Sequence, residues 1–290
     1  MKKKNILGRL LIHIPLILLA LACLLPFILV LSSSFTEEAS LLKNGFSIFP
    51  KKFSVEAYKF IFRSPHEVIS AYKTTIFVTL FGTVVGTLIM AMLAYPMSRP
   101  DYKYRNVISF FVYFTMLFSG GMVAEYLIVA NVLKLKDTVW ALIMPMLLNA
   151  WNIMLLRMFL RSIPFSLIEE ANLEGASEFR IFFSIVLPLS KVGIVTIALF
   201  TALNLWNDWY QSMLYIDHGD ITSLQYMLYR IMNKVTLAQE YGGSVAMKEK
   251  LPNENLRMAL CVVAAGPMLV VFPFFQKYFS KGIVVGSVKE

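Results

Sequence analysis

Long apolar runs alternate with charged segments along this chain. Runs of about twenty mainly apolar residues extend over 10–31, 74–95, 107–129, 139–159, 189–209 and 256–275. A helix of that length crosses the hydrocarbon core of a bilayer. Gly82 and Gly86 in the second run are spaced for close approach of another helix. The pattern predicts an all-α integral membrane protein with six transmembrane helices, in a single domain over residues 1–290.

The composition favours a membrane protein over a soluble one. Hydrophobic residues make up 58% of the chain, charged residues 16%, and the mean hydropathy is +0.66. Soluble domains are far less apolar. The first run is too long for the apolar part of a cleaved signal peptide, and no small-residue cleavage site follows it. A net charge of +9 is explained by membrane orientation, so no nucleic-acid partner is expected.

Basic residues predict the orientation. They gather before the first run and between the second and third runs, at Lys2, Lys3, Lys4, Arg9, Arg99, Lys103 and Arg105. Short basic segments stay on the cytoplasmic side of a membrane, whereas charges in long loops count for little. We therefore expect both termini in the cytoplasm. The long segments 32–72 and 211–255 are expected outside.

The charged segment 161–188, between the fourth and fifth runs, predicts two short cytoplasmic helices. Pro164 suits the first turn of a helix, and Gly175 suits the position just past a helix end, where a left-handed residue is needed. Ser177 can cap a second helix with Glu178 in its first turn. Pro188 marks the point where the next apolar run takes over.

The first of these helices has an apolar side and an acidic side. Phe165, Ile168 and Ala171 fall along one side, while Glu170 and Glu174, four residues apart, share the other. Like charges at that spacing repel by a few tenths of a kcal/mol. A basic surface on another protein is therefore a natural partner for the acidic side. The apolar side is expected to pack into a groove on that partner or against the second short helix.

The spacing in this segment resembles the EAA loop of ABC-importer permeases. The residues that match the loop are Glu169, Ala171, Gly175, Ile185, Leu187 and Pro188. Glu170 replaces the first alanine of the pattern, and Glu174 stands where sugar permeases usually have aspartate. The chain is most similar to the carbohydrate group, the maltose-type permeases for oligosaccharides. Weaker matches are the stretches 31–35, 118–122 and 206–208.

The resemblance implies a type I importer permease fold with cytoplasmic coupling helices, working by alternating access. It implies four kinds of partner: a second permease subunit, two cytoplasmic ATPase subunits, an extracellular solute-binding protein and an oligosaccharide. The chain has no phosphate-binding loop motif, so ATP and magnesium belong to the ATPases, and no catalytic residue or cofactor is expected here. Localisation in a bacterial cell membrane follows. The residues implied in ATPase coupling are Glu169, Glu170, Ala171, Glu174 and Gly175.

Polar residues within the apolar runs are candidates for a substrate pathway, because such groups usually face a bundle interior or a cavity. The candidates are Asn149, Asn152, Asn204, Trp206, Asn207, Asp208, Trp209 and Tyr210. The aromatic rings could stack on sugars while the amides and the carboxylate bind hydroxyls. Two alternatives stay open: the aromatic cluster is an interfacial belt, and the first two asparagines are helix-packing contacts.

Other classes of function have less support in the sequence. An ion-coupled transporter needs paired charges within the membrane, and Asp208 stands alone there. An intramembrane enzyme or a metal site needs a cluster of reactive side chains, whereas the histidines are scattered and both cysteines lie within apolar runs. An ABC importer for a solute other than sugar also remains an alternative.

Overall fold

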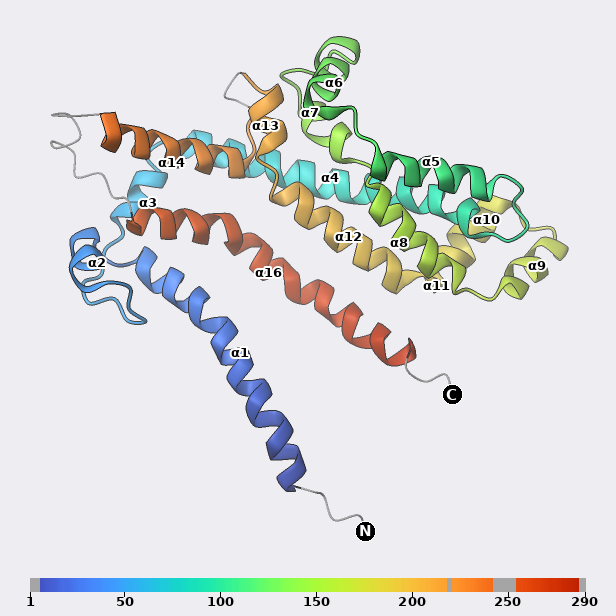
Figure 1. Cartoon of the computed structure of the whole chain (residues 1–290), viewed down its shortest axis with the longest axis horizontal. Coiled ribbons are helices and arrows are strands. Elements are labelled where there is room, and N and C mark those ends of the chain that lie inside the picture. The colour runs from blue at the N-terminus through green and yellow to red at the C-terminus, as the bar shows by residue number, and fades with distance from the viewer. Residues whose placement is uncertain (1–5, 218–220, 242–253, 287–290) are drawn as a thin grey trace. The chain divides into compact units, whose positions relative to one another are not determined.

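The computed structural model describes residues 6–217, 221–241 and 254–286. These residues are mainly helical, and within these ranges the only strand-like pairing is an isolated antiparallel bridge between Thr36 and Phe53. The prediction of a helical protein is confirmed (Figure 1). The described residues fall into two compact units, Met1–Pro65 with Leu228–Pro267, and His66–Met227 with Met268–Glu290.

The first unit joins the region after α1 to the start of α16 (Figure 1). The Glu38 carboxylate accepts hydrogen bonds from the backbone N–H groups of Glu254 and Asn255, at 3.0 and 2.9 Å. These N–H groups lie in the first turn of α16 and have no partner within the helix. The Asn255 side chain donates to the Thr36 carbonyl at 3.2 Å. The helices that begin in this unit are α1 (Ile6–Ser34), α2 (Glu38–Asn44), α3 (Glu56–Ile61) and α16 (Glu254–Gly286).

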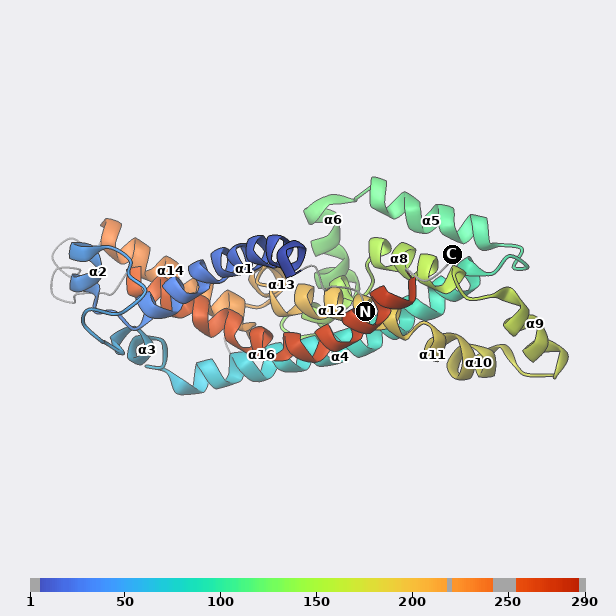
Figure 2. The ribbon, with the colours of Figure 1, turned by 90° about the horizontal axis from the view of Figure 1, so that it is seen from below.

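The second unit is built on the long helix α4 (Pro65–Ser98). Within it α8 (Ala150–Arg161) packs against both α5 (Arg105–Leu117) and α12 (Lys191–Trp206), as Figures 1 and 2 show. The shorter elements are α6 (Gly121–Leu127), η1 (Ile128–Val132), α7 (Val139–Ile143), η2 (Met144–Met146), α9 (Phe165–Leu173), α10 (Glu178–Ile181), η3 (Phe182–Val186), α11 (Leu187–Leu189) and α13 (Tyr210–Tyr215). Helix α14 (Leu224–Tyr241) begins in this unit.

Two glycines of α4 allow other elements to approach closely, as their spacing predicts. A Cβ atom on Gly82 would lie 2.7 Å from Leu205 Cδ1 of α12. A Cβ on Gly86 would lie 2.6 Å from the carbonyl oxygen of Leu147, between η2 and α8. Both distances are far below a normal contact. Because Leu147 presents backbone here, no side-chain movement could make room at Gly86.

The six apolar runs form two kinds of structure, continuous helices and bent helix pairs. In the described parts of the chain, three continuous helices are long and apolar enough to cross a membrane: Leu11–Ser34, Pro65–Ser98 and Glu254–Gln276. The other three runs each form a bent pair, Arg105–Leu117 with Gly121–Val132 at 114°, Val139–Met146 with Ala150–Arg161 at 53°, and Glu178–Leu189 with Lys191–Trp206 at 82°. The described chain therefore has three to six spans, depending on whether each bent pair crosses once.

The predicted bounds also need correction. Residues 65–72 belong to α4, not to an outer loop, because the helix starts nine residues before the apolar run. The fifth run bends at Ser190, so its straight helix begins at Lys191 and ends at Trp206. The predicted outer segment 211–255 contains α13 and α14, and its parts 218–220 and 242–253 lie outside the described residues.

The largest core cluster of the second unit joins α4 to the segment 161–188. It contains buried side chains from α4, α8, α9, α10, η3 and α12. These are Met90, Ala91, Ala94, Tyr95, Met97, Ile153, Leu156, Leu160, Ile168, Ala171, Ile181, Phe182, Val186 and Ile197. The charged segment between the fourth and fifth runs is therefore packed onto the ends of the long helices.

Candidate functional site

Helix α9 ends in a defined left-handed turn. Gly175 follows the helix with φ +80°, a conformation that side chains other than glycine rarely adopt. The N–H of Ala176 donates to the Ala171 carbonyl, and the N–H of Gly175 donates to the Asn172 carbonyl, both at 3.0 Å. This pair of bonds is the Schellman motif, which satisfies the last carbonyls of a helix. The turn fixes the direction in which the chain enters α10.

The two sides of α9 have different surroundings. Ile168 and Ala171 are only 5% and 7% exposed and belong to the core cluster, together with Ile181 of α10. The apolar side therefore packs within this chain, next to the second short helix. The opposite side is exposed and contains the acidic residues Glu169, Glu170 and Glu174. Leu173 beside them is 89% exposed.

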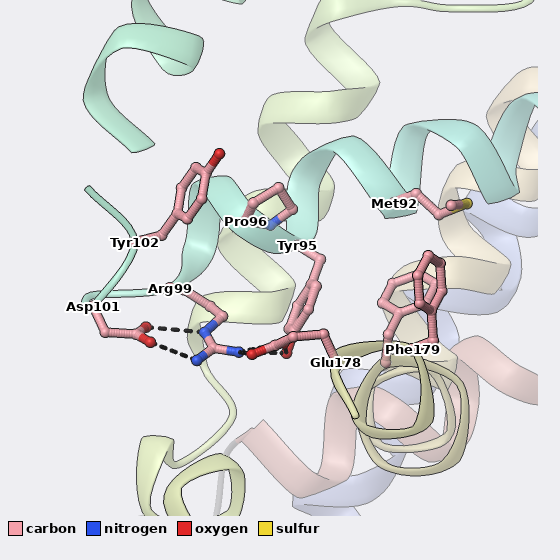
Figure 3. A pocket seen from close by; sticks show the side chains of 9 residues that line it. Met92, Tyr95, Pro96, Arg99, Asp101, Tyr102, Glu178 and Phe179 are labelled. Atoms are coloured by element: carbon pink, nitrogen blue, oxygen red, sulfur yellow. Dashed lines mark hydrogen bonds and ion pairs between the residues drawn. The ribbon is translucent and has the colours of Figure 1, made fainter. Parts of the chain in front are cut away.

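A single guanidinium joins the segment after α4 to α10, as Figure 3 shows. Arg99 Nε donates to Asp101 Oδ1 at 2.9 Å, and its Nη2 donates to Oδ2 of the same carboxylate. Its Nη1 donates to both carboxylate oxygens of Glu178, at 2.7 and 2.6 Å. The Tyr95 hydroxyl accepts from Nη1 at 2.9 Å and donates to Glu178 at 3.0 Å.

Arg99 is buried while its two acidic partners reach solvent. The exposed fraction of the side chain is 8% for Arg99, 45% for Asp101 and 57% for Glu178. The hydrogen bonds from Arg99 lower the pKa of Asp101 below its ordinary value. In the sequence, Arg99 indicates membrane orientation alone. A basic residue followed by aspartate in a short loop gives no sign of a partner 79 residues later.

A polar cavity lies at the break between η2 and α8. Two adjoining hollows, of about 180 and 350 Å³, share Asn149, Asn152 and Asn204 in their walls. Asn149 caps α8, because its side-chain oxygen accepts from the N–H of Asn152 at 3.0 Å. The Asn152 amide also donates to Thr201 of α12 at 3.5 Å. Trp151 lines the larger hollow and is exposed.

The predicted residues 206–210 follow the wall residues Leu203 and Asn204 but do not line these two hollows. Trp206 is buried at the end of α12, and the Asn207 side chain donates to the Leu203 carbonyl at 2.9 Å. The Asp208 carboxylate accepts from the N–H of Gln211, at 3.2 and 3.3 Å to its two oxygens. Trp209 and Tyr210 meet edge to face, with centroids 6.1 Å apart. Of the predicted pathway residues, the structure thus brings Asn149, Asn152 and Asn204 together in one cavity. Residues 206–210 are not part of its described walls.

A comparison with known protein families identifies the chain. The model of the binding-protein-dependent transport system inner membrane component matches residues 10–285. The chain belongs to this family. It is therefore a membrane-embedded, multi-pass transport component, and the expected membership in the importer permease family is confirmed.

The alignments with curated relatives cover almost the whole of this transport component. The chain is 40% identical over 286 residues to the polygalacturonan/rhamnogalacturonan transport system permease protein YtcP of Bacillus subtilis, with 99% of both chains covered. Protein LplC of the same organism is 39% identical, with 92% of this chain and 89% of LplC covered.

A solved structure has the same fold. It is a chain of a bacterial ABC transporter involved in the import of the acidic polysaccharide alginate. The TM-score is 0.79 with 28% identity, and the match covers 96% of this chain and 99% of that chain.

Proposed function

We propose that this chain is the permease subunit of an ATP-driven, binding-protein-dependent importer of carbohydrates, with oligosaccharides as substrates. Relatives named for polygalacturonan, rhamnogalacturonan and alginate transport support a carbohydrate substrate. The assembly contains a second permease, two cytoplasmic ATPases that hold ATP and magnesium, and an extracellular solute-binding protein. Both termini and the segment 161–188 face the cytoplasm.

The geometry of α9 is the observation that carries this proposal. Its buried side fixes it to the core cluster, while its exposed side presents Glu169, Glu170, Glu174 and Leu173. We assign the exposed side to a groove on the ATPase, where basic residues pair with the carboxylates. Ala171 and Gly175 act indirectly, since one packs α9 onto the permease and the other sets the turn after it.

Reversal of one charge on this surface tests the assignment. Exposed ion pairs contribute about 0.2–1 kcal/mol each, and a reversal adds repulsion, so Glu169→Lys should weaken ATPase binding about tenfold. The assay is the amount of ATPase that co-purifies with a tagged permease, together with oligosaccharide uptake into proteoliposomes. Glu170→Lys is tested beside it, because Glu170 departs from the family pattern.

Glu67→Lys is the matched control, because Glu67 is also exposed but lies at the opposite end of α4 from Tyr95 and Arg99. Co-purification and uptake should stay within about twofold of wild type in this variant. If Glu169→Lys retained normal ATPase binding and normal uptake, the proposed role of α9 would be wrong.

The polar cavity is the proposed substrate pathway. Its combined size is in the range of small-molecule sites, about 300–1,000 Å³. A broken helix with polar groups at the break is a common way to build a transporter site. The described side chains in its walls are amides, a hydroxyl and apolar groups, with no acidic residue among them. Such walls suit sugar hydroxyls and also the carboxylates of an acidic oligosaccharide.

Uptake of labelled neutral and acidic oligosaccharides of equal length tests the pathway. Asn204→Ala should raise the apparent KM for the transported sugar about tenfold or more, because lost hydrogen bonds leave its hydroxyls unpaired. Trp206→Ala and Asp208→Ala are assayed in parallel, since the aromatic cluster remains the alternative site. Normal transport by Asn204→Ala with impaired transport by the other two would move the substrate to that cluster.

A further inference from the structure

Arg99 touches both helices of the segment 161–188. Its guanidinium binds the Glu178 carboxylate of α10, and its central carbon lies 6.0 Å from the centroid of the Phe165 ring of α9. It also lies 5.6 Å from the Tyr95 ring of α4, at the distance of a cation–π contact. One side chain thus contacts α4, α9 and α10, with the Gly175 turn between the last two.

Packing alone does not fill the space between α4 and α10. A cavity of about 410 Å³ lies there, with Met92 and Pro96 on the α4 side and Phe179 and Phe182 on the other. Side chains around a cavity lack some of the contacts that hold a close-packed core rigid. The network around Arg99 crosses one end of this cavity, as Figure 3 shows, and therefore ties the two elements together where packing is incomplete.

We infer that Arg99 is a positioning residue that transmits movement of α9 and α10 to the cytoplasmic end of α4. This inference rests on the proposed function. Arginine suits the role because its planar fork binds two carboxylates at once, which the single ammonium of a lysine does less well. A displacement of Glu178 by the ATPase then moves Arg99, and Tyr95 moves with it because its hydroxyl bonds to both.

The two acidic partners of Arg99 provide a matched test. Glu178→Gln removes the charge from the moving helix, while Asp101→Asn removes a charge two residues from Arg99 on its own segment. Both changes keep side-chain shape, and both carboxylates are about half exposed. The complete complex is reconstituted in lipid discs for each variant, with Arg99→Lys as a third. ATPase co-purification and ATP hydrolysis stimulated by the loaded binding protein are measured per assembled complex.

If Arg99 transmits movement, Glu178→Gln should keep ATPase binding within about twofold of wild type, while the rate of stimulated hydrolysis falls about fivefold. A fall of that size is expected when one half-exposed charged contact is lost. Arg99→Lys should be intermediate, and Asp101→Asn should stay within about twofold of wild type. Equal effects of Glu178→Gln and Asp101→Asn would overturn the inference, because Arg99 would then need only a neutralising charge. Loss of ATPase binding in Glu178→Gln would also overturn it, by making α10 part of the docking surface.

The proposed function fails separately from this inference. It is tested by ATPase binding to Glu169→Lys, whereas transmission is tested by hydrolysis per bound ATPase in Glu178→Gln. Normal binding by Glu169→Lys rejects the docking role of α9 and leaves the second measurement unaffected.

Discussion

The left-handed turn at Gly175 allows a backbone effect to be separated from a side-chain effect. A Cβ atom at this position would meet nothing within 4 Å, so a substitution there acts through φ and not through a clash. A non-glycine residue in this conformation costs about 1–2 kcal/mol, and asparagine costs less. A change of about 1 kcal/mol shifts the equilibrium between the native turn and an alternative about fivefold. We expect uptake to fall in the order Gly175→Asn, Gly175→Ala, Gly175→Val.

Gly45 provides the control for this series. It has φ +72°, also with nothing within 4 Å of a Cβ atom, and it follows α2 in the other compact unit. Because Gly45 has ψ −173°, in a region almost confined to glycine, Gly45→Val should lower the melting temperature of the permease at least as much as Gly175→Val while uptake per assembled complex stays normal. The assays are thermal unfolding in detergent, ATPase co-purification and uptake into proteoliposomes. Equal uptake by Gly175→Asn and Gly175→Val would refute the reasoning, since backbone strain would then be irrelevant to coupling.

The new side chain in Gly175→Asp has the same shape as that in Gly175→Asn but adds a negative charge beside Glu174. Gly175→Asp should therefore transport less than Gly175→Asn, and the difference should shrink at high salt. Gly86→Ala should reduce uptake and stability, because overpacking against the Leu147 carbonyl costs about 1–3 kcal/mol, whereas Gly266→Ala, with nothing within 4 Å, should have no such effect in the same assays. The lowered pKa of Asp101 means that its ionised form stabilises the fold above the unfolded pKa and that this contribution is lost as pH falls through the folded pKa. The melting-temperature difference between wild type and Asp101→Asn should therefore begin to shrink below about pH 4 and vanish only at lower pH, and a constant difference would contradict it. In a variant without Cys23 and Cys261, a cysteine at position 170 should react with impermeant reagents only in opened cells, and labelling from outside would reject the proposed orientation.

Much of the fold follows from local signals in the sequence. The apolar runs predict the long helices because only a helix satisfies its own backbone in lipid. Pro164, Gly175 and Ser177 predict the two short helices because each residue type suits one position of a cap, and Ser177 does accept a hydrogen bond from the N–H of Arg180. Gly82 and Gly86 predict close approach of other elements, although not which elements.

The bends and the site geometry depend on contacts that sequence patterns do not record. The break before Asn149 requires the Leu147 carbonyl to face Gly86 of α4, more than sixty residues earlier. The partner of Arg99 lies 79 residues away, and exposed glutamates occur on both short helices. Hydropathy also cannot separate a straight span from a bent pair, because both have the same composition.

The proposed coupling surface and the proposed substrate cavity border the same packed cluster. Ile168 and Ala171 bring α9 into the core, and Ile153 of α8 belongs to the same core next to Asn152, which lines the cavity. Met90 of α4 belongs to both, since it is fully buried in the cluster and forms part of the cavity wall. Closely packed interiors are hard to compress, so a displacement of α9 is passed on instead of being absorbed. Residues 147–149 are not helical, and in the proposed importer this break is a point about which α8 and the cavity wall that holds Asn149 would turn. In the proposed importer, a displacement of α9 by the ATPase would therefore reach the cavity as a movement of α8 against α4 and α12.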